Sequence, residues 1–141
     1  MSTRSRCWGQ QGLVFSGMLA MSIGAALALG DVLPRGPYRL EQVLTNTERP
    51  SGIAIAADGR IFYGERVTGK IRVVEGGRLI ATPFASLAVA SSGSGEGLID
   101  VAVHPGKPYI YAFYTESGTR ANKVVRYDDN KNIGGNPVTI L

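Results

Sequence analysis

Residues 51–67 read SGIAIAADGRIFYGERV, and residues 99–116 read IDVAVHPGKPYIYAFYTE. Each stretch holds a short apolar run, a turn, and a second run rich in aromatic and β-branched side chains. In the first stretch Asp58-Gly59 separates the two runs, and an Asp-Gly pair between β-prone segments is a strong hairpin signal. The sequence therefore predicts a β-hairpin in each stretch.

The two stretches belong to a longer internal repeat. At a spacing of 48 residues, Val101-Ala102-Val103 aligns with Ile53-Ala54-Ile55, and Tyr109-Ile110-Tyr111 aligns with Ile61-Phe62-Tyr63. Further on, KVVRYDDNKN aligns with KIRVVEGGR, with Lys123 against Lys70 at a spacing of 53. A repeat of about 50 residues with roughly four short strands is typical of β-propeller blades.

No segment from 51 to 141 shows a sustained helical period with caps, so the predicted fold class is all-β. We expect an incomplete β-propeller of about two four-stranded antiparallel blades, at about 51–96 and 97–141. The innermost strand of a blade lies between neighbouring blades. The runs GIAIA and DVAV are small and apolar, and we expect both faces of these strands to be buried.

The amino terminus has the composition of a secretory signal peptide. Arg4 and Arg6 precede an apolar run from about 13 to 29, and Ala26-Leu27-Ala28 offers a small-residue cleavage site. We expect a signal-peptide helix at 1–28, with an uncleaved membrane anchor as the alternative. Residues 29–50 form a lead-in segment, in which 39–44 is a possible first strand.

Cleavage would remove Cys7, the single cysteine, and leave a periplasmic or secreted chain without disulfides and without a membrane contact. It would also lower the net charge from +4 to +2, because Arg4 and Arg6 leave with the signal peptide. The remaining charges are interspersed and form no basic patch. We therefore expect no nucleic-acid partner.

The segments from ERPSGIAIAADGR to GGRL, from GEGLIDVAVHPG to FYTE, and from KVVRYDDN to NPVTIL resemble the amino-terminal third of the glucose/sorbosone dehydrogenase family. This resemblance implies a six-bladed propeller that binds pyrroloquinoline quinone (PQQ) and calcium and oxidises an aldose. In such enzymes a histidine removes a proton from the sugar while a hydride passes to the quinone. The stretch that carries this histidine has no counterpart in this sequence, so no catalytic residue and no metal ligand is assigned.

Glu96 is the one cofactor-contact candidate that the resemblance gives. The family places a Gln or Glu in the Gly-rich loop before the second blade, and here that loop reads SSGSGEGLID. Strict counting places the family position on Gly95, and a shift of one residue brings Glu96 into place. The alternative for Glu96 is a solvated loop carboxylate.

Several other features have a structural and a functional interpretation. His104, the single histidine, aligns with Ala56 before a turn, and we expect a turn residue rather than a general base. The segment at 128–132 is expected to be a polar turn rather than a calcium loop, because the EF-hand spacing is absent. The Gly/Ser run at 91–97 lacks the features of a phosphate-binding loop. The aromatic residues of the second hairpin are either blade packing or a sugar-stacking platform; they are Tyr109, Tyr111, Phe113 and Tyr114.

A closed six-bladed ring needs roughly 250 to 300 residues, so we expect this chain to be a fragment that binds neither PQQ nor calcium alone. Expressed alone, it should dissolve poorly and show no dye-linked sugar oxidation. Three hypotheses remain open: part of an exported PQQ-dependent sugar dehydrogenase, a non-catalytic extracellular propeller module, or an inactive truncated product. The sugar, the electron acceptor and the oligomeric state are not determined by the sequence.

Overall fold

The computed structural model describes Gly36 and residues 39–141, and every regular element within them is a β-strand. The predicted signal-peptide helix lies outside the described residues. Residues Glu41–Leu141 form one compact unit, to which the following description applies. No helix in the described part of the chain is long and apolar enough to span a membrane.

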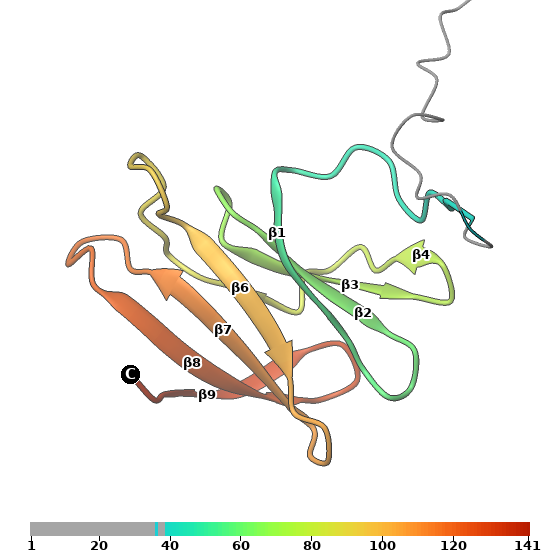
Figure 1. Cartoon of the computed structure of the whole chain (residues 1–141). Coiled ribbons are helices and arrows are strands. Elements are labelled where there is room, and N and C mark those ends of the chain that lie inside the picture. Colours follow the sequence, from blue (N-terminus) through green and yellow to red (C-terminus); the bar gives the residue numbers. More distant parts are fainter. Residues whose placement is uncertain (1–35, 37–38) are drawn as a thin grey trace, which may run out of the picture. The chain divides into compact units, whose positions relative to one another are not determined.

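The first sheet contains the strands β1 to β5. Its order is β1-β2-β3-β4, all antiparallel (Figure 1). The short β5 also pairs with β3. The strands are β1 (Pro50–Ile55), β2 (Ile61–Glu65), β3 (Lys70–Glu75), β4 (Arg78–Leu79) and β5 (Ala85–Ser86). The outermost position of this sheet is therefore shared by two strands of two residues each.

The second sheet contains four antiparallel strands in the order β6-β7-β8-β9. They are β6 (Leu98–Val103), β7 (Tyr109–Thr115), β8 (Asn122–Asp129) and β9 (Gly134–Thr139). The all-β prediction and the two successive antiparallel sheets are confirmed. The expected strand at 39–44 is wrong, because the first strand begins at Pro50. Val43 and Leu44 instead help to line a groove on the first sheet.

The Asp-Gly turn forms as the sequence predicts. Gly59 has φ of +87°, a conformation that glycine adopts without steric cost. The Ala56 N–H donates to the Arg60 carbonyl at 2.8 Å, which closes the hairpin between β1 and β2. In the second sheet the His104 N–H donates to the Tyr109 carbonyl at 2.9 Å in the same way.

The two hairpins differ by one residue in their closing pairs. Ile55 pairs with Ile61 across the first turn, whereas Val103 pairs with Ile110 across the second, so the second turn encloses one more residue. The aromatic strands therefore correspond at a spacing of 49, not 48, and Phe62 corresponds to Tyr111. Side chains alternate between the two faces of a strand. A shift of one residue in the alignment therefore moves every side chain of the aromatic strand to the opposite face.

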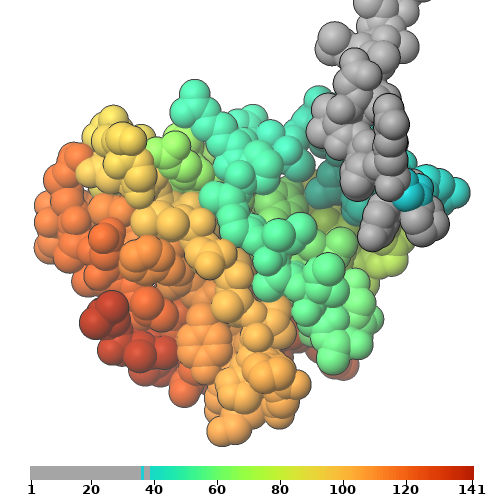
Figure 2. All heavy atoms as spheres, in the orientation of Figure 1, coloured from blue at the N-terminus to red at the C-terminus, as the bar shows by residue number. Residues whose placement is uncertain are grey.

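The hydrophobic core lies in the seam where the two sheets pack face to face. Phe62, Ile71 and Val73 of the first sheet meet Leu98 and Val101 of the second, and all five are at most 3% exposed. Figure 2 shows the atoms of the two sheets in direct contact on the face in view. At about 25 cal/mol per Å² of apolar surface removed from water, this seam is the main source of stability in a unit without a disulfide.

The outer face of the first sheet differs from the expectation. Ile53 and Ile55 are 70% and 69% exposed, although both faces of β1 were expected to be buried. In β6 the corresponding Val101 is buried in the seam, and Ala102 on the opposite side is exposed. Each innermost strand thus has one covered and one open apolar face among the described residues.

Candidate functional site

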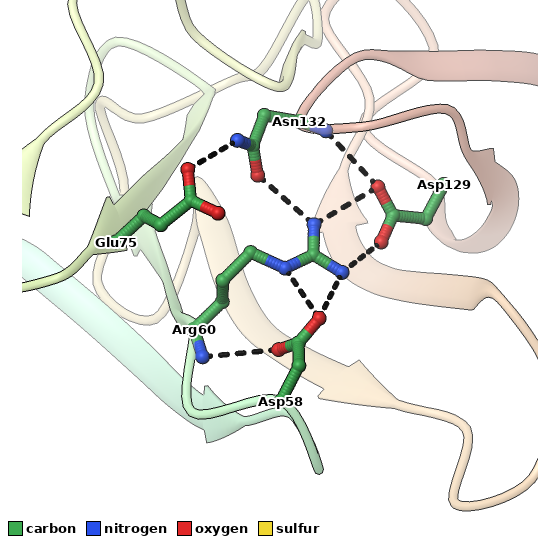
Figure 3. A network of polar contacts seen from close by, with 5 residues as sticks. All are labelled: Asp58, Arg60, Glu75, Asp129 and Asn132. Carbon is green, nitrogen blue, oxygen red and sulfur yellow. Dashed lines mark hydrogen bonds and ion pairs between the residues drawn. The ribbon is translucent and has the colours of Figure 1, made fainter.

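Polar side chains gather at each end of the seam. Figure 3 shows the cluster at the end near the Asp-Gly turn. Arg60, next to that turn, reaches Asp129 at the end of β8 with two contacts, Nη1 to Oδ1 at 3.2 Å and Nη2 to Oδ2 at 2.5 Å. Its Nη1 also donates to Asn132 Oδ1 at 2.9 Å. Asn132 Nδ2 in turn donates to Glu75 Oε2 at 3.0 Å, which joins β3 of the first sheet to the loop after β8.

Asp58 completes this arrangement from the turn itself. Its Oδ2 accepts from Arg60 Nε at 2.8 Å, and its Oδ1 accepts from the Arg60 backbone N–H at 3.1 Å. That backbone hydrogen bond holds the pKa of the Asp58 carboxyl below its usual value. The hydrogen bonds from Arg60 to Asp129 raise the pKa of Arg60, so the guanidinium stays charged.

We call Asp58, Arg60, Glu75, Asp129 and Asn132 the Arg60 cluster. The side chains of Arg60 and Asp129 are only 15% and 6% exposed, so this ion pair is shielded from solvent. A groove of about 480 Å³ opens beside the cluster. Both oxygens of the Asp129 carboxylate bind Arg60, so the cluster links the first sheet to the second. The expectation of a polar turn at 128–132 agrees with this arrangement.

The opposite end of the seam carries the loop that contains Glu96. Arg66, at the end of β2, donates from Nε to the Glu96 carbonyl at 2.8 Å and from Nη2 to the Gly93 carbonyl at 3.2 Å. The Glu96 carboxylate accepts from the Gly93 N–H through Oε2 at 2.6 Å, and its Oε1 forms an ion pair with Arg120. The loop is therefore fixed from the first sheet through Arg66 and from the second sheet through Arg120.

Arg120 lies in the turn between β7 and β8 with φ of +57°, which is uncommon for a side chain of this size. Its Nη1 is 3.4 Å from Ser92 Oγ, so it contacts two points of the loop. The Arg120 side chain is 56% exposed, whereas that of Glu96 is 17% exposed. We call residues 91–97 the Glu96 loop, which Arg66 and Arg120 hold from the two sheets. It presents an oriented carboxylate beside a guanidinium that still reaches solvent.

The other residues singled out from the sequence have structural surroundings. His104 lies in the turn after β6, where its Nδ1 accepts from the Gly106 N–H at 3.0 Å, as expected for a turn residue. The Gly/Ser run leads directly into β6, so it is a connecting loop. Tyr114 is buried in the seam at 8% exposure. Tyr111 and Phe113 lie on the opposite face of the same strand and border a shallow depression.

Sequence reasoning gave Glu96 as a candidate and 128–132 as a polar turn, but it predicted neither the arginines around Glu96 nor the contact of that turn with Arg60. Arg60 follows the Asp-Gly pair immediately, and Asp129 corresponds to a position near the Gly76-Gly77 turn of the first repeat. Among the described residues, no three His, Cys, Asp or Glu side chains come together in a way that could hold a metal ion.

Two successive antiparallel sheets, packed face to face with each innermost strand next to the other sheet, are adjacent blades of a β-propeller. Solved structures with this fold match the chain. An oxidoreductase (glucose dehydrogenase) from Thermus thermophilus matches with a TM-score of 0.65 and 34% identity over 73% of this chain. The PQQ-bound form of aldose sugar dehydrogenase from Streptomyces coelicolor matches with a TM-score of 0.62 and 26% identity over 72% of this chain.

The model of the Glucose / Sorbosone dehydrogenase family matches residues 47–136, which is more than half of the chain. The chain therefore belongs to the glucose/sorbosone dehydrogenase family. It spans about a third of the length of the two solved structures, 32% in each case. No match was found among curated proteins.

Proposed function

We propose that these two blades form part of an exported PQQ-dependent dehydrogenase that oxidises an aldose sugar. The observation that carries the proposal is the family match over 47–136, which includes the first sheet, the Glu96 loop and the second sheet as far as the start of β9. The PQQ-bound Streptomyces coelicolor aldose sugar dehydrogenase supports the cofactor. The predicted signal peptide supports export to the periplasm or the medium.

In this proposal the Glu96 loop is the part of the chain that contacts the cofactor. PQQ, when bound, supplies the quinone that accepts a hydride from the sugar. The exposed N–H groups of Arg120 would hold a carboxylate of PQQ, because a guanidinium binds carboxylates through paired hydrogen bonds. The Glu96 carboxylate keeps Arg120 oriented and its charge partly balanced before the cofactor arrives.

The base that removes the sugar proton and the calcium ligands are not assigned to any described residue. His104 does not fit the role of base, because its Nδ1 is bound to the backbone of its own turn. A general base also needs an orienting partner and access to a substrate. In this proposal the contribution of residues 39–141 is to cofactor binding.

A segment exchange tests the proposal. Residues 39–141 replace the matching segment of the Streptomyces coelicolor enzyme, and the hybrid is assayed for PQQ binding and for aldose-dependent dye reduction with calcium present. We expect PQQ binding and sugar oxidation in the hybrid but not in a host that lacks the segment. A hybrid that folds yet binds no PQQ would contradict the proposal. The 141-residue chain alone is expected to give no turnover.

A further inference from the structure

Arg66, the residue directly after β2, crosses the seam to the Glu96 loop. Its Nε donates to the Glu96 carbonyl at 2.8 Å, and its Nη2 donates to the Gly93 carbonyl at 3.2 Å. The Arg66 backbone takes part as well, because its carbonyl accepts from the Leu98 N–H at 2.9 Å where the loop enters β6. A single residue at the end of β2 therefore holds the loop both within its turn and at its exit.

The Arg66 guanidinium differs from those of Arg60 and Arg120 in its partners. Those two arginines each form an ion pair with a carboxylate. Among Gly36 and residues 39–141, no carboxylate lies within ion-pair distance of Arg66. A guanidinium donates from a planar fork in fixed directions, so the two carbonyls that it binds are held in a set arrangement. The role of Arg66 is therefore to fix the backbone of the loop rather than to neutralise an acidic side chain.

The fixed backbone of the loop in turn orients the Glu96 carboxylate. Gly93 is held at both of its polar groups: its carbonyl binds Arg66, and its N–H donates to Glu96 Oε2 at 2.6 Å. The two loop residues are closely packed, since a Cβ on Gly93 would lie 2.7 Å from the Glu96 Cδ. With Oε2 bound to Gly93, the other carboxylate oxygen, Oε1, pairs with Arg120. The contacts therefore run from Arg66 through the Glu96 loop to Arg120.

We infer that Arg66 is a positioning residue, which orients Arg120 through the Glu96 loop before a ligand binds. The inference rests on the proposed function for the identity of that ligand, PQQ. The Arg120 side chain is 56% exposed and lies in an exposed turn, so its contacts with the loop are what restrict it. A binding group that is already oriented loses less conformational entropy on binding, which increases affinity. Removal of the Arg66 guanidinium should therefore weaken PQQ binding by releasing the loop.

The first measurement is the Kd for PQQ, by titration calorimetry of the segment-exchange hybrid. Arg66→Met keeps the aliphatic stem but removes both donors, and the Kd should rise about tenfold. Arg66→Lys keeps the charge but not the planar fork, so it should lose most of the same affinity. Arg78→Met, at an exposed position of β4, is the matched control and should leave the Kd unchanged. In an Arg120→Gly background, Arg66→Met should have little further effect, because Arg66 acts through Arg120. Additive losses, or full affinity in Arg66→Lys, would overturn the inference.

The second measurement needs no PQQ: hydrogen exchange at single amides, in the 141-residue chain and in the PQQ-free hybrid. In Arg66→Met the Gly93 N–H should exchange at least about tenfold faster, because the loop opens locally. The Leu98 N–H binds the Arg66 backbone, which the substitution retains, so its exchange should not change. Equal acceleration of both amides would indicate a loosened seam, and that result or an unchanged Gly93 would overturn the inference. If the unsubstituted hybrid binds no PQQ, the proposed function fails, and Gly93 exchange still decides whether Arg66 positions the loop.

Discussion

Each end of the seam has an ion pair between an arginine and a carboxylate, but the two pairs differ in their exposure to solvent. At one end Arg60 binds Asp129 with both side chains almost buried; at the other Arg120 binds Glu96 with the arginine more than half exposed. A shielded ion pair is expensive to break, because removal of one partner leaves a buried charge. An exposed pair contributes little to stability and leaves donors for a ligand. The Arg60 cluster is therefore structural, whereas the Arg120 guanidinium beside Glu96 remains exposed to solvent.

The largest effect on this comparison is expected from Asp129→Ala. The substitution leaves the Arg60 guanidinium in the seam without its main partner, so the free energy of unfolding should fall by about 3 kcal/mol. Urea unfolding of the chain measures this loss. Asp58→Ala is the matched control: its side chain is 54% exposed, and its loss should cost under about 1 kcal/mol. Equal losses in the two variants would contradict the structural role of the shielded pair.

The second prediction compares one glycine at each end. Gly97 has φ of +115°, and a Cβ there would lie 2.2 Å from the Arg66 carbonyl oxygen, whereas a Cβ on Gly59 meets nothing within 4 Å. Gly59→Ala should lower the free energy of unfolding by about 1 kcal/mol, the cost of the positive φ for a residue with a Cβ. Gly97→Ala should cost at least about 2 kcal/mol, because the backbone must also move. Denaturant midpoints decide the order, and a larger loss for Gly59→Ala would be evidence against the close packing of the Glu96 loop.

The third prediction concerns alkaline pH and two tyrosines whose pKa is raised by burial. Burial in the seam raises the pKa of Tyr127 above its usual value of 10.0. The folded state then prefers the neutral phenol, so its stabilising contribution is complete below pH 10.0 and decreases as the pH rises toward the folded-state pKa. Tyr127→Phe should flatten part of the decline in the free energy of unfolding above that pH. The rest of the decline should remain, because burial also raises the pKa of Tyr63. An unchanged slope in Tyr127→Phe would show that this phenol does not titrate on unfolding.

The smallest effect on stability is expected from Arg120→Ala. Its exposed pair with Glu96 should contribute under about 1 kcal/mol. Arg120 has a positive φ, which is strained for alanine as well, whereas glycine adopts it without strain. Arg120→Gly should therefore be as stable as the wild type or nearly so. Thermal unfolding checks this, and a loss as large as that of Asp129→Ala would remove the contrast between the two ends.

The fold could be predicted because each repeat carries its own local signals. The Asp-Gly turn and the alternation of apolar residues define the hairpins without any distant contact. The alignment of the aromatic strands was wrong by one residue, because six residues, HPGKPY, lie between Val103 and Ile110, whereas five, AADGR, lie between Ile55 and Ile61. That difference depends on hydrogen bonding within the turn, which spacing alone does not reveal. The strand expected at 39–44 failed because strand propensity gives no information about a pairing partner.

The candidate site was predictable only in part. A family pattern with a shift of one residue made Glu96 a candidate, but its partner Arg120 lies 24 residues away and meets it through the β7–β8 turn. The Arg60 cluster joins residues up to 72 positions apart, and no local motif marks such a contact. Long-range ion pairs depend on how two sheets pack, which follows from the seam rather than from any one segment.

The most direct test of the account is PQQ affinity in the segment-exchange hybrid with one substitution at each end of the seam. We predict that Glu96→Ala raises the Kd for PQQ about tenfold, equivalent to about 1.4 kcal/mol, because Arg120 loses its orientation. Asp129→Asn, which retains hydrogen-bonding capacity at the other end, should leave the Kd unchanged. Equal affinities in the wild-type hybrid and Glu96→Ala, or a weaker affinity only in Asp129→Asn, would contradict the assignment of the Glu96 loop to the cofactor.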